Sequence, residues 1–296
     1  MKATPLAAFA VTVAAALCAF APGAASAQGR DSVYVVSGVR VDETAANSAA
    51  AQQAGMAAAQ RIGLQRLIYR LVPTGDLAAR TMPAAEAFDP MLVERLVQSV
   101  DVEEERRSAT RYIGRLTVRF NPAGVRSYLR QQNLTVIEAR TAPVLVAPQV
   151  ASGTPEEVAA LWRETWEQGG FANELAPLSI APATLQGAPS WETAAPFAQQ
   201  AAAASALYAT LRVQGSTASA TLVEVSGAQR RDRGEITARM QGTEPAAVRA
   251  ALASLAEQAS LRIQDEWKAR AAVGGAQGGP EGRLTDDRCV QPCEWS

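Results

Sequence analysis

Three arginines share a spacing that could give them a common chemistry, and a fourth could join them from an earlier segment. Arg111, Arg115 and Arg119 alternate with apolar residues, and a period of two places all three on one face of a strand. Arg40, in an earlier segment rich in β-branched residues, is expected to join that face. If the face is uncovered, its guanidinium groups would bind an anionic group such as a cell-wall carboxylate or a lipid phosphate. If carboxylates of a neighbouring strand pair with the arginines, the face is a solvated set of weak ion pairs, and we prefer this interpretation.

The sequence contains no histidine, so the commonest general base near neutral pH is absent. Triads that depend on histidine cannot form within the chain, and zinc sites lose their usual nitrogen ligand. Asp286 and Asp287 are adjacent and point apart, whereas Glu156 and Glu157 are explained by the start of a helix. We therefore expect no catalytic residue, no metal and no cofactor, and we keep a carboxylate-based hydrolase as an alternative.

The first 27 residues are typical of a secretory signal peptide. Lys2 precedes an apolar run over residues 6–20, and the small side chains of residues 25–27 follow it. The run is short for a membrane span, and no later segment is long enough. We expect cleavage after Ala27 and export to the periplasm, with no transmembrane segment in the mature chain.

Cys289 and Cys293 lie near the end of the mature chain with three residues between them. An exported protein meets an oxidising compartment, so a local disulfide is the expected state. A redox centre usually has two intervening residues instead of three. The surrounding segment, residues 273–296, begins rich in glycine and lacks periodicity, which predicts a flexible tail apart from this cysteine loop.

The length fits one large domain or two domains of ordinary size. The chain has 296 residues, 48% of them hydrophobic, which is enough to bury a core. The net charge is −1, and no basic segment is interleaved with aromatic residues, so nucleic-acid binding receives little support.

The first domain is expected over residues 31–150. Strands are predicted at 32–41, 111–120 and 143–150, and helices at 44–72, from 90 onward and at 123–132. The apolar face of the second strand should pack on the long helix. A mixed-charge run at 103–107 is expected to be solvated, although it could bind a partner. This order predicts an α+β or α/β layer sandwich.

The second domain is expected over residues 154–272. Helices are predicted at 154–168, 191–204 and from 243, and strands at 178–180, 207–214, 218–225 and 235–240. Trp162, Trp166 and Trp191 could stack on a sugar ring, but the helical spacing of the first two favours the core. The whole chain is thus predicted to be an α+β protein of two units, each with helices covering a mixed sheet.

Residues 34–150 resemble a proteobacterial envelope family catalogued as domain of unknown function 2066 (DUF2066). The resemblance rests on VSGVRVD at 36–42, LQRLIYRL at 64–71, YIGRLTVRFNP at 112–122 and APVLV at 142–146. The family has no assigned catalytic residues to transfer, so the resemblance implies an envelope location alone.

Residues 197–269 resemble in pattern the small α+β domain at the N-terminus of TolB-type periplasmic proteins and of lipoprotein activators of cell-wall synthases. The resemblance rests on ALYATLRV at 206–213 and ATLVEVSG at 220–227. It implies contact with another protein of the envelope. We therefore expect a non-enzymatic periplasmic binding or accessory factor, whose partner is an envelope protein or a cell-wall component. The alternatives are a binder of an anionic or glycan ligand through the arginine face, and the hydrolase.

Overall fold

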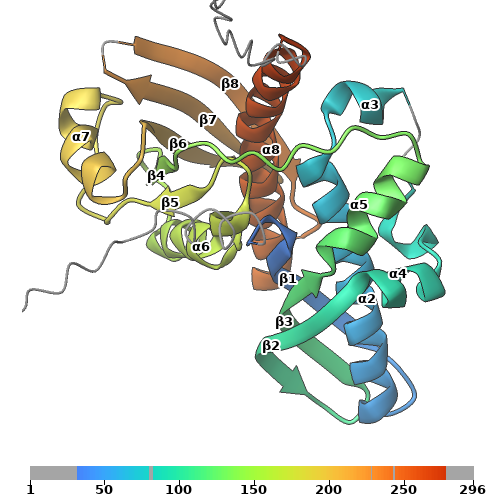
Figure 1. Cartoon of the computed structure of the whole chain (residues 1–296). Coiled ribbons are helices and arrows are strands. Elements are labelled where there is room, and N and C mark those ends of the chain that lie inside the picture. The colour runs from blue at the N-terminus through green and yellow to red at the C-terminus, as the bar shows by residue number, and fades with distance from the viewer. Residues whose placement is uncertain (1–31, 80–82, 228, 243, 278–296) are drawn as a thin grey trace, which may run out of the picture.

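The chain folds into two sheets with helices packed on them, an α+β architecture, in the computed structural model (Figure 1). The structure describes residues 32–79, 83–227, 229–242 and 244–277. The expected signal peptide over residues 1–27 and the Cys289–Cys293 loop lie outside these ranges. No helix in the described ranges is both long and apolar enough to cross a membrane.

The first sheet has three antiparallel strands in the order β1-β3-β2. Its elements, with the helices around them, are β1 (Val35–Thr44), α2 (Ser48–Leu71), α3 (Thr74–Ala78), α4 (Pro90–Leu96), β2 (Val97–Arg107), β3 (Arg111–Phe120) and α5 (Pro122–Gln131). As expected, α2 packs on the apolar face of β3. Close approach explains Gly63 within this helix, because an added Cβ would lie 3.3 Å from the Phe120 ring.

The second sheet has five strands in the order β5-β4-β6-β7-β8. Its elements, with the helices around them, are β4 (Val144–Val150), α6 (Glu156–Gln168), β5 (Leu178–Ile180), α7 (Trp191–Gln200), β6 (Ser205–Gln214), β7 (Thr217–Ser226), β8 (Gln229–Arg239) and α8 (Pro245–Gln277). Strand β4 runs parallel to β5 and β6, and the other pairs are antiparallel. Helices α6 and α8 pack on one face of this sheet, and α7 packs on the other.

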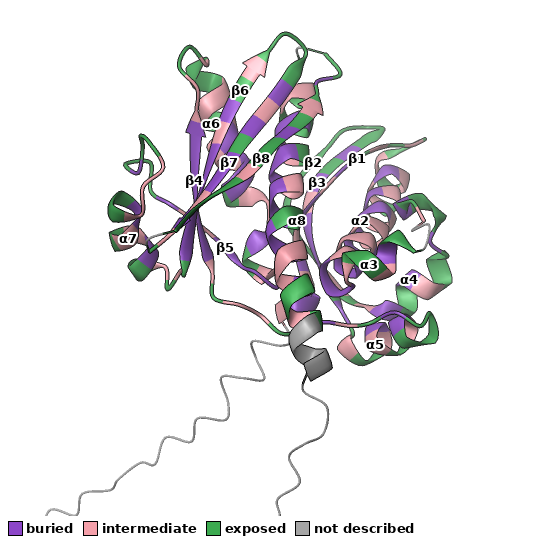
Figure 2. Cartoon of the chain, turned by 90° about the horizontal axis from the view of Figure 1, so that it is seen from above, coloured by how far each residue is buried: buried purple, intermediate pink, exposed green. Residues whose placement is uncertain are grey.

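Helix α8 joins the two units, and Figure 2 shows it standing between the five-stranded sheet and α2. Its first half contributes Leu252, Leu255 and Ala259 to the core of the second unit. Its second half places Trp267 and Ala271 against the core of the first unit. One helix therefore sets the position of each unit relative to the other.

The expected boundary after Val150 is wrong. Strand β4, which was assigned to the first unit over 31–150, pairs with β5 and β6 in the second sheet. The segment between α5 and β4 therefore carries the chain from one sheet to the other. A continuous apolar strand carries no mark of the sheet that it joins, because parallel partners lie far along the chain.

Three element boundaries also differ from expectation. The mixed-charge run at 103–107 is the end of β2, an edge strand that pairs with β3. Strand β8 begins at Gln229, earlier than the strand expected at 235–240. The long helix begins at Ser48, because the Asn47 side chain caps it by accepting from the Ala50 amide at 2.9 Å. In β2 and in the first half of β8, exposed charged residues conceal the strand pattern.

Candidate anion-binding cleft

The four arginines identified in the sequence lie on one face of the three-stranded sheet, opposite to α2. Arg40 of β1 and Arg115 of β3 are directly paired across the strands. Arg111 and Arg119 lie on the same side of β3, in alternation with the buried Tyr112, Leu116 and Phe120. The shared face was predicted correctly, and we call it the outer face of the sheet.

Three of these arginines form ion pairs with carboxylates of β1 and β2. Arg111 contacts Asp42 at 2.6 Å, and Arg119 contacts Asp101 at 3.1 Å. Arg115 contacts Glu104 at 2.6 Å and also contacts Glu103. The pairs of Arg111 and Arg119 are about half exposed, so each contributes between nothing and about 1 kcal/mol to stability, whereas Arg115 is more buried, with 20% of its side chain exposed.

The same ion pairs keep the carboxyls ionised. The hydrogen bond from Arg111 lowers the pKa of Asp42, and the hydrogen bond from Arg115 lowers the pKa of Glu104. A carboxyl that acts as a general acid near neutral pH needs a raised pKa. Asp42 and Glu104 are therefore suited to hold arginines in place and unsuited to donate protons.

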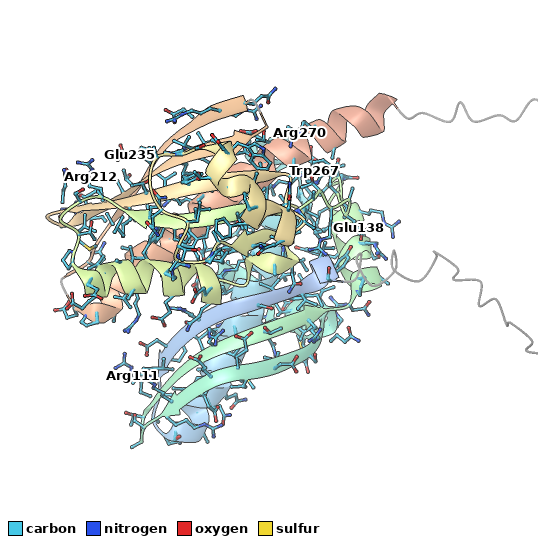
Figure 3. The ribbon with its side chains drawn as sticks, turned by 90° about the vertical axis from the view of Figure 1, so that its left-hand side faces the viewer. Arg111, Glu138, Arg212, Glu235, Trp267 and Arg270 are labelled. Carbon is cyan, nitrogen blue, oxygen red and sulfur yellow. The ribbon has the colours of Figure 1, made fainter. Side chains whose placement is uncertain are left out.

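A cleft of about 530 Å³ lies between the outer face and the second unit. Strands β1, β2 and β3 form its floor, and the end of α6 and the start of α8 form its walls. Arg40, Arg111 and Arg115 line it, whereas Arg119 lines a separate hollow together with Asp101. The structure thus brings three of the four arginines into one cleft. Arg111 is labelled in Figure 3, near the end of the three-stranded sheet.

Of the four arginines, Arg40 has no carboxylate within ion-pair distance in the described ranges. It is partly buried, and its Nη2 donates to Gln168 Oε1 of α6 at 2.8 Å. Burial is the main cause that lowers its pKa; Arg115 and Arg249 lower it further, and Glu164 raises it. A guanidinium remains charged at neutral pH despite such a shift. Arg40 is therefore a partly desolvated cation with capacity for an anion.

Arg249 of α8 brings a second cation to the cleft, and its side chain is exposed. It lies among the lining residues, and within the described part of the chain no carboxylate is in ion-pair distance of it. Arg106 of β2 also lines the cleft and also has no such partner among the described residues. Arg66 of α2 lines the cleft too, but it forms an ion pair with Glu257. The cleft therefore holds three arginines with free charge.

Arg249 was not predicted from the sequence, because the clearest pattern in the last helix is its buried stripe. The residues of that helix that line the cleft repeat at helical spacing on its other side: Ala246, Arg249, Ala250, Ala253 and Glu257. This second stripe is visible in the sequence. Its meaning depends on the three-stranded sheet that faces it, and no local pattern reveals that contact.

Gly38 makes the approach of α6 to the outer face possible. It lies at a bulge in β1 with φ of +68°, and a Cβ at this position would lie 2.5 Å from the Gln168 carbonyl oxygen. The bulge therefore seats the end of α6 next to Arg40, whose hydrogen-bond partner is the Gln168 side chain. Only glycine fits this site.

Replacing Gly38 with alanine is expected to lower the free energy of unfolding by about 2 kcal/mol or more, and Gly153→Ala is the matched control. A left-handed backbone at a residue with a Cβ costs about 1–2 kcal/mol, and the clash with Gln168 adds to this cost. Gly153 has φ of +84° but no neighbour within 4 Å of an added Cβ. Urea denaturation of both variants measures the difference, and equal losses would contradict the tight contact between β1 and α6.

The candidate residues for other chemistries lie elsewhere. Trp162 and Trp166 are each 1% exposed and pack edge to face at 5.2 Å in the second core, so the expectation of a core position is confirmed. In the described ranges, no three side chains of the metal-binding types gather at one place. The cleft, which gathers Arg40, Arg106 and Arg249, is therefore the candidate site that the described part of the chain supports.

Comparisons with known proteins do not assign a family. No family model and no curated protein matches the chain. Among solved structures, an uncharacterised protein is similar over 44% of this chain and 94% of its own length, with 12% identity and a TM-score of 0.27. A Xanthomonas campestris protein of family DUF330 is similar over 46% and 87%, with 15% identity and a TM-score of 0.23. Similarity this low carries no argument, and the resemblances to DUF2066 and to the TolB-type domain stay predictions.

Proposed function

We propose that the protein is an exported, non-enzymatic binding factor of the cell envelope, and that its cleft holds an anionic group of an envelope component. The observation that carries this proposal is the meeting of Arg40 and Arg249 in the cleft, each without a carboxylate partner among the described residues. Arginine binds carboxylate and phosphate strongly, because its planar fork offers two parallel donors, and Arg40 is also partly buried. The signal-peptide pattern at the start of the sequence supports export.

Calorimetric titration with soluble anionic cell-wall fragments tests the proposal. The unmodified protein is expected to bind them, more weakly as salt is added, and the Arg40→Gln/Arg249→Gln variant is expected to lose at least about tenfold in affinity. Arg212→Gln is the matched control, because Arg212 is exposed on the five-stranded sheet and outside the cleft (Figure 3). Equal heats from the unmodified protein and the double variant would overturn anion binding. Fractionation that finds the uncleaved chain inside the cell would overturn export.

A further inference from the structure

Helix α8 forms one wall of the cleft, and this wall is apolar on either side of Arg249. Ala246 and Ala250 are exposed and Ala253 is partly exposed, and all three line the cleft next to Arg249. From the floor, Ile113 of β3 adds a large apolar side chain that is 39% exposed. A small hydrated anion bound at Arg40 would leave this apolar surface in contact with water.

We propose that the ligand of the cleft is an amphipathic organic anion, with one carboxylate or phosphate group at Arg40 and Arg249 and a short alkyl chain along Ile113, Ala250 and Ala253. This inference rests on the proposed function and specifies the ligand class for the same site. The volume of about 530 Å³ falls within the range of sites that enclose small organic ligands. A fatty acid and a single-chain phospholipid both offer this chemistry.

The charges around the cleft favour one anionic group over a row of them. Glu164 of α6 lines the cleft near Arg40 and has no ion-pair partner among the described residues, whereas the charge of Glu257 is taken up by Arg66. A second carboxylate or phosphate on the ligand that came close to Glu164 would be repelled. An acidic peptide would also bring backbone amides against an alanine wall that offers them no hydrogen-bond partner. The observations therefore favour a small amphiphile over an acidic peptide.

Titration calorimetry with matched probes tests this ligand class. The probes are octanoate, octyl phosphate, acetate, inorganic phosphate, uncharged octyl glucoside below its micelle concentration, and a penta-glutamate peptide. We expect each methylene that enters the cleft to raise affinity about threefold, so that the octyl anions bind at least tenfold tighter than acetate and phosphate. Comparison of octanoate with octyl phosphate identifies the preferred head group.

Two variants separate the parts of the site. Arg40→Gln is expected to weaken both octyl anions about tenfold, and Arg212→Gln is expected to leave them unchanged. Ile113→Thr keeps a β-branched residue on the strand and is expected to reduce the gain from the alkyl chain without affecting acetate.

The outcomes distinguish this inference from the proposed function. If acetate, phosphate and the octyl anions bind equally and depend on Arg40, the amphipathic ligand is overturned and anion binding stands. If the penta-glutamate peptide binds tighter than the octyl anions, the ligand is instead an acidic chain and the inference is overturned. If octyl glucoside binds as well as octyl phosphate, or if no anion binds, both the inference and the proposed anion site are overturned.

Discussion

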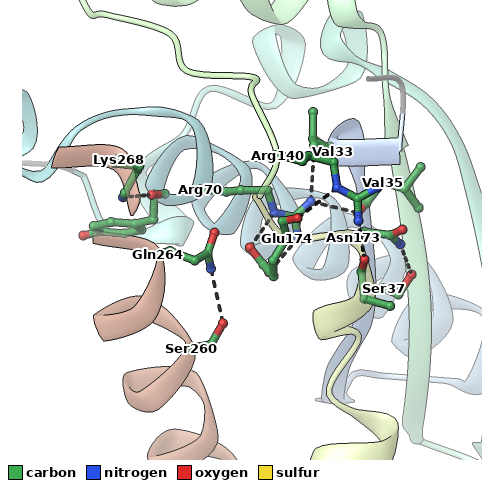
Figure 4. Close-up of polar contacts among 12 residues, drawn as sticks. Val33, Val35, Ser37, Arg70, Arg140, Asn173, Glu174, Ser260, Gln264 and Lys268 are labelled. Carbon is green, nitrogen blue, oxygen red and sulfur yellow. Dashed lines mark hydrogen bonds and ion pairs between the residues drawn. The ribbon is translucent and has the colours of Figure 1, made fainter. Parts of the chain in front are cut away.

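Replacing Arg70 with methionine is expected to lower the free energy of unfolding by about 3–5 kcal/mol, the cost of breaking a buried ion pair by removing one partner. Arg70 of α2 is 2% exposed, and it holds the carboxylate of Glu174 through two parallel bonds of 2.8 and 2.9 Å (Figure 4). Its Nη1 also donates to the carbonyl oxygens of Val33 and Val35, at 2.7 and 2.9 Å. The variant would leave a carboxylate that is 13% exposed without its cation and two carbonyls without a donor.

Arg61→Met is the matched control for this prediction. Arg61 is partly exposed on the same helix, and arginine and methionine have similar helix propensities. Urea denaturation should show a loss well below 1 kcal/mol for the control. The double variant Arg70→Met/Glu174→Met should be less destabilised than Arg70→Met alone, because no charge remains buried. If Arg70→Met unfolds at the same urea concentration as Arg61→Met, the ion pair contributes nothing to the contact between the units.

Periodicity predicted most of the helices and strands, because apolar faces bury in regular patterns. The alternation in β3 was a correct guide to its partner α2 and to the face that carries Arg115. Strand β2 and the start of β8 were missed, because an edge strand with exposed side chains needs no apolar alternation. The sheet to which β4 belongs is decided by parallel pairing with a distant segment, and local sequence does not encode that pairing.

The candidate site was predictable only in part, for the same reason. The outer face and its arginines follow from a period of two, and the carboxylate partners of Arg111 and Arg119 match the interpretation preferred from the sequence. The cleft forms because α8 faces that surface. This contact brings Arg249 into one cleft with Arg40, although the two residues are more than two hundred positions apart in the sequence. Lys268, which holds the second half of α8 against the end of α2, belongs to no motif.

Lys268→Met is expected to lower the free energy of unfolding by about 3 kcal/mol and to release the second half of α8 from the first unit. Apart from Lys2, Lys268 is the only lysine in the sequence, and it is 1% exposed. Its Nζ donates to the carbonyl oxygens of Tyr69 and Val72, at 2.7 and 3.1 Å, where α2 ends. The last carbonyls of a helix have no partner within it and carry partial negative charge. A buried ammonium donates hydrogen bonds to these oxygens and also offsets their charge. Methionine keeps the apolar stem but leaves two buried acceptors unpaired, at about 1–3 kcal/mol each.

Hydrogen exchange locates the effect of this variant. Backbone amides of residues 261–272 should exchange faster in Lys268→Met, whereas those of β6 and β7 should keep most of their protection, because the second core contacts the first half of α8. Arg270→Met is the matched control, since Arg270 is exposed on the same helix and lies over the Trp267 ring, with 5.9 Å to the centroid. Because α8 forms one wall of the cleft, Lys268→Met should also weaken binding at Arg40, which lies in another part of the structure. Unchanged exchange over residues 261–272 would show that apolar contacts at Trp267 and Ala271 suffice to hold the two units together.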